Sequence, residues 1–177
     1  MRNYVISSIA IFVMFCSGCS QSNIGDMLLG TWDVSLYLSP SQVAKISEDS
    51  FPNDLSIEMT MSGTQTYHLG GKYDGTVEFT IRLKFEEEEI PLRFLAKETG
   101  SWEIHGNVLV ETTANSVITP LDDLTRKVVK KSPEFQTMVT PIAGESQSTK
   151  IIHISKTVAE LQMIDPPYWD MTLRKKS

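Results

Sequence analysis

The stretch VEFTIRLKF, residues 77–85, alternates apolar and polar side chains along its whole length. Its odd-numbered positions are all apolar, and its even-numbered positions carry Glu, Thr, Arg and Lys. A period of two residues is typical of a β-strand with one buried face. The stretch therefore predicts a strand whose apolar side packs into a core.

Shorter segments on both sides of this stretch repeat the same alternation. These are residues 32–38, 55–61, 90–96, 102–104, 108–110, 152–154, 161–163 and 169–173. Glycine-containing turns are predicted at Gly70-Gly71, at Asp74-Gly75 and at His105-Gly106-Asn107. Strands spaced by about ten residues predict a mostly β protein, an antiparallel meander that forms a closed or partly open barrel.

One segment departs from the strand pattern. Thr119 is a candidate N-cap, Pro120 suits the first helical position and Pro133 ends the pattern, so we predict a short amphipathic helix over 120–132. A helical turn is predicted around 43–46, and residues 141–148 are predicted to form a polar loop.

The N-terminal segment has the layout of an export signal. Arg2 precedes an apolar run of about 12 residues, which is shorter than the roughly 20 residues of a membrane-spanning helix. The run ends at Cys16-Ser-Gly-Cys19, which resembles the lipobox of bacterial lipoproteins, with Cys16 where leucine is usual. The resemblance implies cleavage before Cys19, a palmitate-bearing lipid on that cysteine, and attachment to a membrane of the cell envelope, facing the periplasm. By lipoprotein sorting rules, Ser20 favours the outer membrane over the inner one.

Two alternatives to the lipobox interpretation are an uncleaved N-terminal anchor and an ordinary signal peptide that contains two cysteines. On the lipoprotein interpretation, residues 1–18 are the signal peptide, 19–26 a lipidated tether and 27–177 one β domain. About 159 residues then remain, with no cysteine beyond Cys19 for a disulfide or thiolate metal site. Loss of Arg2 changes the formal charge from −6 to about −7, which argues against a nucleic-acid partner.

The sequence Gly30-Thr-Trp32, at the start of the first predicted strand, resembles the Gly-x-Trp motif of lipocalins and their calycin relatives. The resemblance implies that Trp32 closes one end of the barrel and that Arg174, on the last strand, packs across its ring. A guanidinium over an indole contributes about 0.5–2 kcal/mol. Gly100-Ser-Trp102 resembles a hairpin common in bacterial lipocalin-like domains.

A narrower resemblance is to ToxS-like periplasmic regulators, which have this hairpin, a helical insertion and closing strands in the same order. Those proteins complete a lipocalin-like barrel together with a partner sensor. They keep an inner-membrane anchor, whereas the present sequence predicts a lipid anchor.

Candidate catalytic residues are hard to find in the sequence. His68, His105 and His153 are scattered over separate strands and turns, and no Gly-x-Ser-x-Gly motif occurs. The acidic run 86–89 could bind a cation, but four like charges after a strand are more typical of a solvated hairpin tip. We therefore predict no catalytic residue, no metal site and no cofactor.

The inward-facing positions predict what a ligand cavity would contain. The candidate lining residues are Met59, Met61, Tyr67, Phe79, Ile81, Phe94 and Trp102. Methionine side chains suit a variable apolar ligand, although they equally fill ordinary core gaps. The leading hypothesis is a non-enzymatic, membrane-tethered binding protein for a small hydrophobic or amphipathic molecule. The alternative is an accessory protein–protein module that stabilises a periplasmic sensor or envelope assembly; an inhibitor or immunity lipoprotein is a third class left open.

Overall fold

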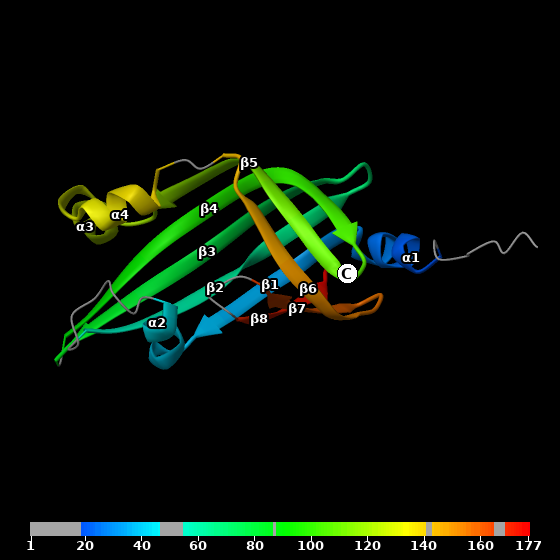
Figure 1. Cartoon of the computed structure of the whole chain (residues 1–177). Helices are drawn as coiled ribbons and strands as arrows, with labels where there is room; N and C mark the ends of the chain where they lie inside the picture. The colour runs from blue at the N-terminus through cyan, green and yellow to red at the C-terminus, as the bar shows by residue number, and fades with distance from the viewer. Residues whose placement is uncertain (1–18, 47–54, 87, 141–142, 165–168) are drawn as a thin grey trace, which may run out of the picture.

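The computed structural model describes residues 19–46, 55–86, 88–140, 143–164 and 169–177. The predicted signal peptide, residues 1–18, lies outside the described residues. Within them, eight strands alternate with short loops and four short helices (Figure 1). The strands are β1 (Gly30–Leu38), β2 (Leu55–His68), β3 (Lys72–Phe85), β4 (Glu88–His105), β5 (Val108–Pro120), β6 (Ser146–Ile154), β7 (Val158–Met163) and β8 (Asp170–Lys175). The helices are α1 (Cys19–Leu28), α2 (Pro40–Ile46), α3 (Asp123–Lys131) and α4 (Pro133–Met138).

Each strand pairs antiparallel with the next, and β8 returns to pair with β1, so the sheet is a closed eight-stranded barrel. The prediction of a mostly β, lipocalin-like meander barrel is confirmed. Of the two predicted forms, closed or partly open, the barrel has the closed one. The alternation in residues 77–85 belongs to β3, whose odd-numbered side chains face inward. Two of the predicted turns are confirmed, at Gly70-Gly71 and at Gly106, where all three glycines have positive φ.

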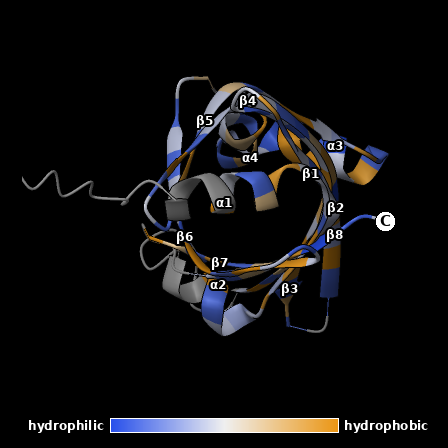
Figure 2. Ribbon diagram, turned by 90° about the vertical axis from the view of Figure 1, so that its right-hand side faces the viewer, coloured by the Kyte–Doolittle hydropathy of each residue, from blue (hydrophilic) through white to orange (hydrophobic). Residues whose placement is uncertain are grey.

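The strands differ in length, and this shapes the interior. β2 to β5 have 13 to 18 residues, whereas β7 and β8 have six each. The long strands therefore extend beyond the short ones as a curved sheet (Figure 1). In the view along the barrel, α1 lies in front of the ring of strands, and α4 lies inside the outline of this ring (Figure 2).

Two cores fill the barrel at its two ends. The α1-end core contains Leu28 of α1 together with Trp32, Tyr67, Leu109, Leu161 and Leu173. The α3/α4-end core contains Phe79, Leu92, Phe94 and Val129, with Phe135 of α4 packed against it. The rings of Phe79, Phe94 and Phe135 stack in sequence, with centroids 5.0 and 6.4 Å apart.

Several predicted boundaries need correction. The helix predicted at 120–132 exists but begins at Asp123, because Pro120 still belongs to β5 and Asp122 is the N-cap. The Asp122 carboxylate accepts hydrogen bonds from the Thr125 backbone N–H and hydroxyl, both at 2.8 Å. The Thr125 hydroxyl in turn accepts a hydrogen bond from the Arg93 backbone N–H, which fixes α3 to β4.

Two further corrections concern the strands. Gly75 lies inside β3, paired with Gln65, and does not form a turn. On β6, a register shift between Ile151 and His153 turns Ile151 inward and leaves Ile152 exposed, so the alternation predicted for 152–154 is wrong. The predicted helical turn around 43–46 is confirmed as part of α2.

Candidate functional site

A cavity of about 340 Å³ lies inside the barrel between the two cores. Its size is near the lower limit of typical small-molecule sites. The apolar lining residues are Val34, Leu36, Met59, Met61, Val77, Phe79, Ala96, Ile118, Trp169 and Met171. The polar lining residues are Gln65, Tyr73, Glu98, Glu111, Thr113, Ser116 and Gln147.

The lining is segregated along the barrel axis. On β2, Met59 and Met61 face the α3/α4 end of the cavity, while Gln65 lies nearer α1. On β4, Ala96 likewise precedes Glu98 in the direction of α1. The cavity therefore has an apolar wall toward α3 and α4 and a polar floor toward α1.

The polar floor is organised around two carboxylates that the sequence analysis did not identify. Oε1 of Glu111 accepts hydrogen bonds from the Gln65 amide and, at 3.1 Å, from the Tyr67 hydroxyl. Oε1 of Glu98 accepts hydrogen bonds from the Tyr73 hydroxyl and, at 2.7 Å, from the Thr113 hydroxyl. Four neutral donors thus orient the two acids.

The pKa of the Glu111 carboxyl is raised from 4.5 to about 7, mainly by burial. The nearby Glu98 contributes to this rise, and the hydrogen bonds from Tyr67 and Gln65 offset part of it. Burial and the acceptor carboxylates also raise the pKa of the Tyr67 and Tyr73 hydroxyls, so both tyrosines stay protonated donors. The floor therefore has a carboxyl group that titrates near neutral pH, held among permanent hydrogen-bond donors.

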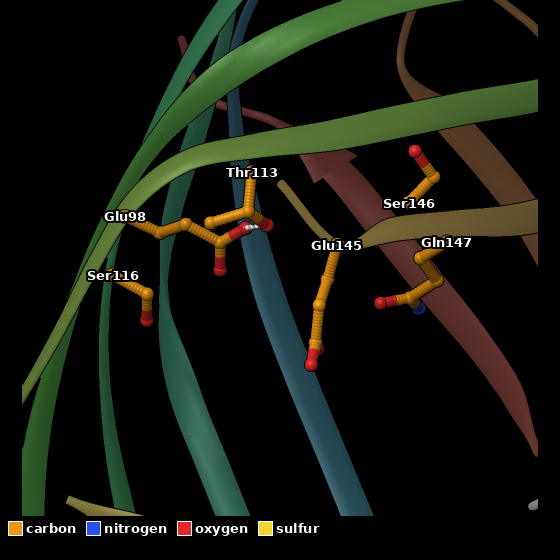
Figure 3. A pocket seen from close by; sticks show the side chains of 6 residues that line it. All are labelled: Glu98, Thr113, Ser116, Glu145, Ser146 and Gln147. Atoms are coloured by element: carbon orange, nitrogen blue, oxygen red, sulfur yellow. Dashed lines mark hydrogen bonds between the residues drawn. The ribbon is translucent and has the colours of Figure 1, made fainter. Parts of the chain in front are cut away.

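A smaller space of about 180 Å³ adjoins the cavity where β5 separates from β6. Strand pairing ends beside Thr113, whose backbone exchanges hydrogen bonds with Gly144 and Glu145 at 2.7 and 2.8 Å. Glu98, Thr113, Ser116 and Gln147 line both spaces, and Glu145 and Ser146 complete the smaller one. We call this space the side pocket. Figure 3 shows that polar side chains surround it, with the second oxygen of Glu98 pointing away from Thr113.

Trp32 lies in the α1-end core, and the cation over its ring belongs to Lys175 and not to Arg174. Trp32 is fully buried and donates its indole N–H to the Leu28 carbonyl at 2.6 Å. Nζ of Lys175 lies 4.6 Å from the Trp32 ring centroid and also donates to the Leu29 carbonyl. Trp32 is directly opposite Lys175 in the β1–β8 ladder, and opposite residues share a face. Arg174 is therefore on the outer face, where it is exposed.

The other predicted pocket residues divide between the cavity and its flanking cores. Met59, Met61 and Phe79 line the cavity. Ile81 and Phe94 belong to the α3/α4-end core.

Tyr67 and Trp102 belong to the α1-end core, with their rings in edge contact at 5.8 Å. Tyr67 still serves the cavity through its hydroxyl, which binds Glu111. The sequence did hold a signal for the missed acids: Glu98 and Glu111 occupy inward positions of β4 and β5, where apolar residues would be expected.

The histidines and the acidic run are on the surface. His68 pairs with Asp74, and His105 lies 3.1 Å from Glu103, in both cases between exposed side chains. Within the part of the chain that the structure describes, no group of three or more His, Cys, Asp or Glu is arranged to hold a metal ion. Glu86, Glu88 and Glu89 are exposed around the β3–β4 turn, as predicted for a hairpin tip; Glu87 lies outside the described residues.

The predicted tether, residues 19–26, lies in helix α1. Ile24 and Leu28 of this helix pack on the α1-end core. None of the helices in the described ranges is long and apolar enough to cross a membrane.

Neither the family-model scan nor the search of curated proteins found a match for this chain. The fold alone therefore defines the class, an eight-stranded antiparallel barrel consistent with a lipocalin-like fold. Such a barrel is compatible with ligand binding.

Proposed function

We propose that the protein is a lipid-anchored, lipocalin-like binding protein that holds a small hydrophobic or amphipathic molecule in its barrel. The observation that carries this proposal is the cavity of about 340 Å³ inside the closed barrel, with an apolar wall and a polar floor. A well-packed domain of this size usually leaves few voids larger than a water molecule. The cavity is therefore a feature that needs a function, and the proposed role requires no catalysis.

The lipid anchor in this proposal rests on Cys16-Ser-Gly-Cys19 and the short apolar run before it. Anchoring at Cys19 would place α1, which begins there, on the membrane side of the barrel. The α3/α4 end would then project away from the membrane, and we place the domain in the periplasm. Ser20 supports the outer membrane as its location.

The alternative role, an accessory module that stabilises a sensor, has less support. The ToxS-like resemblance implies a barrel that a partner protein completes. In this structure β1 pairs with both β2 and β8, so the barrel is closed without a partner. The part of β5 beyond Thr113 pairs with β4 but not with β6, and it borders the side pocket. We therefore interpret this edge as part of the binding site.

The test is binding of a neutral solvatochromic dye to the full chain in lipid nanodiscs, with empty nanodiscs as the blank. Ala96→Phe places a ring in the cavity, and Lys97→Phe places the same ring on the outer face of β4. We expect saturable binding to the wild type, a loss of at least about tenfold in affinity for Ala96→Phe, and no change for Lys97→Phe. Wild type without saturable binding, or a folded Ala96→Phe variant that binds like the wild type, would contradict the proposal.

A further inference from the structure

We propose that the ligand of this cavity is an amphiphile with a cationic amine head group, an alkylamine or arylalkylamine, whose ammonium is bound between Glu98 and Glu111. The inference rests on the proposed function and specifies its ligand class. It follows from the charge of the polar floor, the segregation of the lining and the size of the cavity.

The charged residues of the binding site are all acidic. Glu98 and Glu111 line the cavity, and Glu98 and Glu145 line the side pocket. Among the described lining residues of both spaces there is no Lys or Arg. The ion pairs between described residues also leave these three glutamates out. Their negative charge is therefore not balanced by cations of the protein.

Neutral donors satisfy only one oxygen of each inward acid. Both hydrogen bonds to Glu111 fall on its Oε1, and both hydrogen bonds to Glu98 fall on its Oε1. No buried side-chain oxygen or nitrogen is left without a partner in the described part of the chain. The second oxygen of each carboxylate is therefore in contact with open space, and both residues line the same cavity. An ammonium group has three donors and a positive charge, which suit two such acceptors.

The same arrangement disfavours an anionic head group once Glu111 is ionised. Above the pKa of Glu111, about 7, a fatty-acid carboxylate would add a third negative charge to a partly dehydrated space, where like charges repel more strongly than in water. A neutral alcohol could donate a hydrogen bond but would leave the two charges uncompensated. The floor therefore favours a cation over both alternatives.

The apolar wall and the volume define the remainder of the ligand. The tail would extend from the floor toward Met59, Met61 and Phe79, which line the cavity on the α3/α4 side. A space of about 340 Å³ suits a medium-length alkyl chain or one aromatic ring and is small for a two-chain lipid. The side pocket offers an acidic approach to the floor through the wall between β5 and β6.

The test compares three probes of equal chain length, n-octylammonium, n-octanol and n-octanoate. Their binding to the full chain in lipid nanodiscs is measured by titration calorimetry at about pH 8, where an alkylamine is still protonated and the pH lies above the pKa of Glu111 of about 7. Empty nanodiscs give the partitioning blank. We expect n-octylammonium to bind at least about tenfold more tightly than n-octanol, and n-octanoate to bind most weakly.

Two variants locate the effect. Glu98→Gln and Glu111→Gln keep the shape of the floor and remove one charge each, and Glu103→Gln removes an exposed charge from β4 as the matched control. Each floor variant should lose at least about tenfold in affinity for the amine and stay within about twofold for the alcohol. The control should bind all three probes like the wild type.

The outcomes separate this inference from the proposed function. Equal binding of amine and alcohol, tighter binding of octanoate, or an amine preference that survives in both folded floor variants would overturn the amine inference and leave the cavity function intact. Failure of all three probes, together with failure of the dye, would overturn both. Dye binding that Ala96→Phe abolishes, without binding of any octyl probe, would overturn the amine inference alone.

Discussion

Replacement of Glu111 by Gln should change how the stability of the protein depends on pH. Burial raises the pKa of this carboxyl in the folded protein from 4.5 to about 7. Between these two values the folded protein retains a proton that the unfolded chain releases. The free energy of unfolding therefore falls as the pH rises from about 4.5 to about 7, and this contribution is level above pH 7.

The magnitude follows from the same two pKa values. The difference between these two pKa values corresponds to a change of at most about 3 kcal/mol in the free energy of unfolding. Between about pH 5 and about pH 8, where titration is incomplete at the lower end, Glu111 should reduce the free energy of unfolding by about 2 kcal/mol. The groups that face Glu111 are Gln65 and Tyr67 on β2, Tyr73 on β3 and Glu98 on β4, so a glutamine retains neutral hydrogen-bond partners.

The assay is urea unfolding of the full chain at about pH 5 and about pH 8, with wild type, Glu111→Gln and Glu103→Gln measured in parallel. The Glu111→Gln variant should lose about 2 kcal/mol less than the wild type over this interval and be the more stable protein at the higher pH. Glu103→Gln, which removes an exposed charge, should follow the wild type. Parallel pH profiles for wild type and Glu111→Gln would refute the reasoning, because Glu111 would then have an ordinary pKa.

Three further predictions concern the barrel end, the floor and the anchor. Lys175→Ala should lower the free energy of unfolding by about 1–2 kcal/mol, because the variant loses the cation over the buried indole and its hydrogen bonds to carbonyls. The control, Arg174→Ala, should change it by less than about 0.5 kcal/mol. Equal effects of the two variants in urea unfolding would contradict the observed pairing. Gly100→Ala should cost about 1–3 kcal/mol, since a methyl group there would overlap a backbone oxygen of β5 and lie 2.5 Å from a tyrosine ring of β3. Gly75→Ala, whose nearest neighbour would be 3.7 Å away, is its control in the same thermal melts, and a similar loss in both variants would count against the packing argument. Cys19→Ser should abolish metabolic labelling with palmitate, and a variant that still labels would remove the basis for the lipid anchor.

Much of the fold is predictable from the sequence because a closed meander consists of local patterns. Alternation over residues 77–85 correctly indicates which face of β3 is buried. The same reasoning fails where one residue changes the parity of a strand. The register shift after Ile151 exposes Ile152, and the cation over Trp32 is Lys175, one position beyond the predicted Arg174. The exact register between paired strands decides which side chains face inward and which residues are opposite one another. A local sequence pattern does not contain this register.

The candidate site was predicted less well than the fold. The apolar wall follows from alternation, but the two acids of the floor form no linear motif of the kind that clustered histidines would. Glu98 and Glu111 lie on two consecutive strands, and they face one cavity only when β4 and β5 pair across the bulge near Gly100. Charged residues at inward positions of strands indicate such a site, because a buried charge is costly unless the site uses it.

Methionine side chains offer the most direct test of the central claim, that a small amphiphile occupies the barrel interior. NMR spectra of the full chain with isotope-labelled methionine methyl groups would be recorded during a titration with n-octylammonium. Met59, Met61 and Met171 line the cavity. Met138 packs on the α3/α4-end core, and Met163 is buried behind the lining residue Gln147, whose amide donates to its sulfur, without lining the cavity itself. The account predicts saturable shifts of the three cavity methyl groups, with smaller changes at Met138 and Met163. Uniform shifts across all assigned methionines, or cavity methyl groups that stay in place at saturating probe, would contradict it.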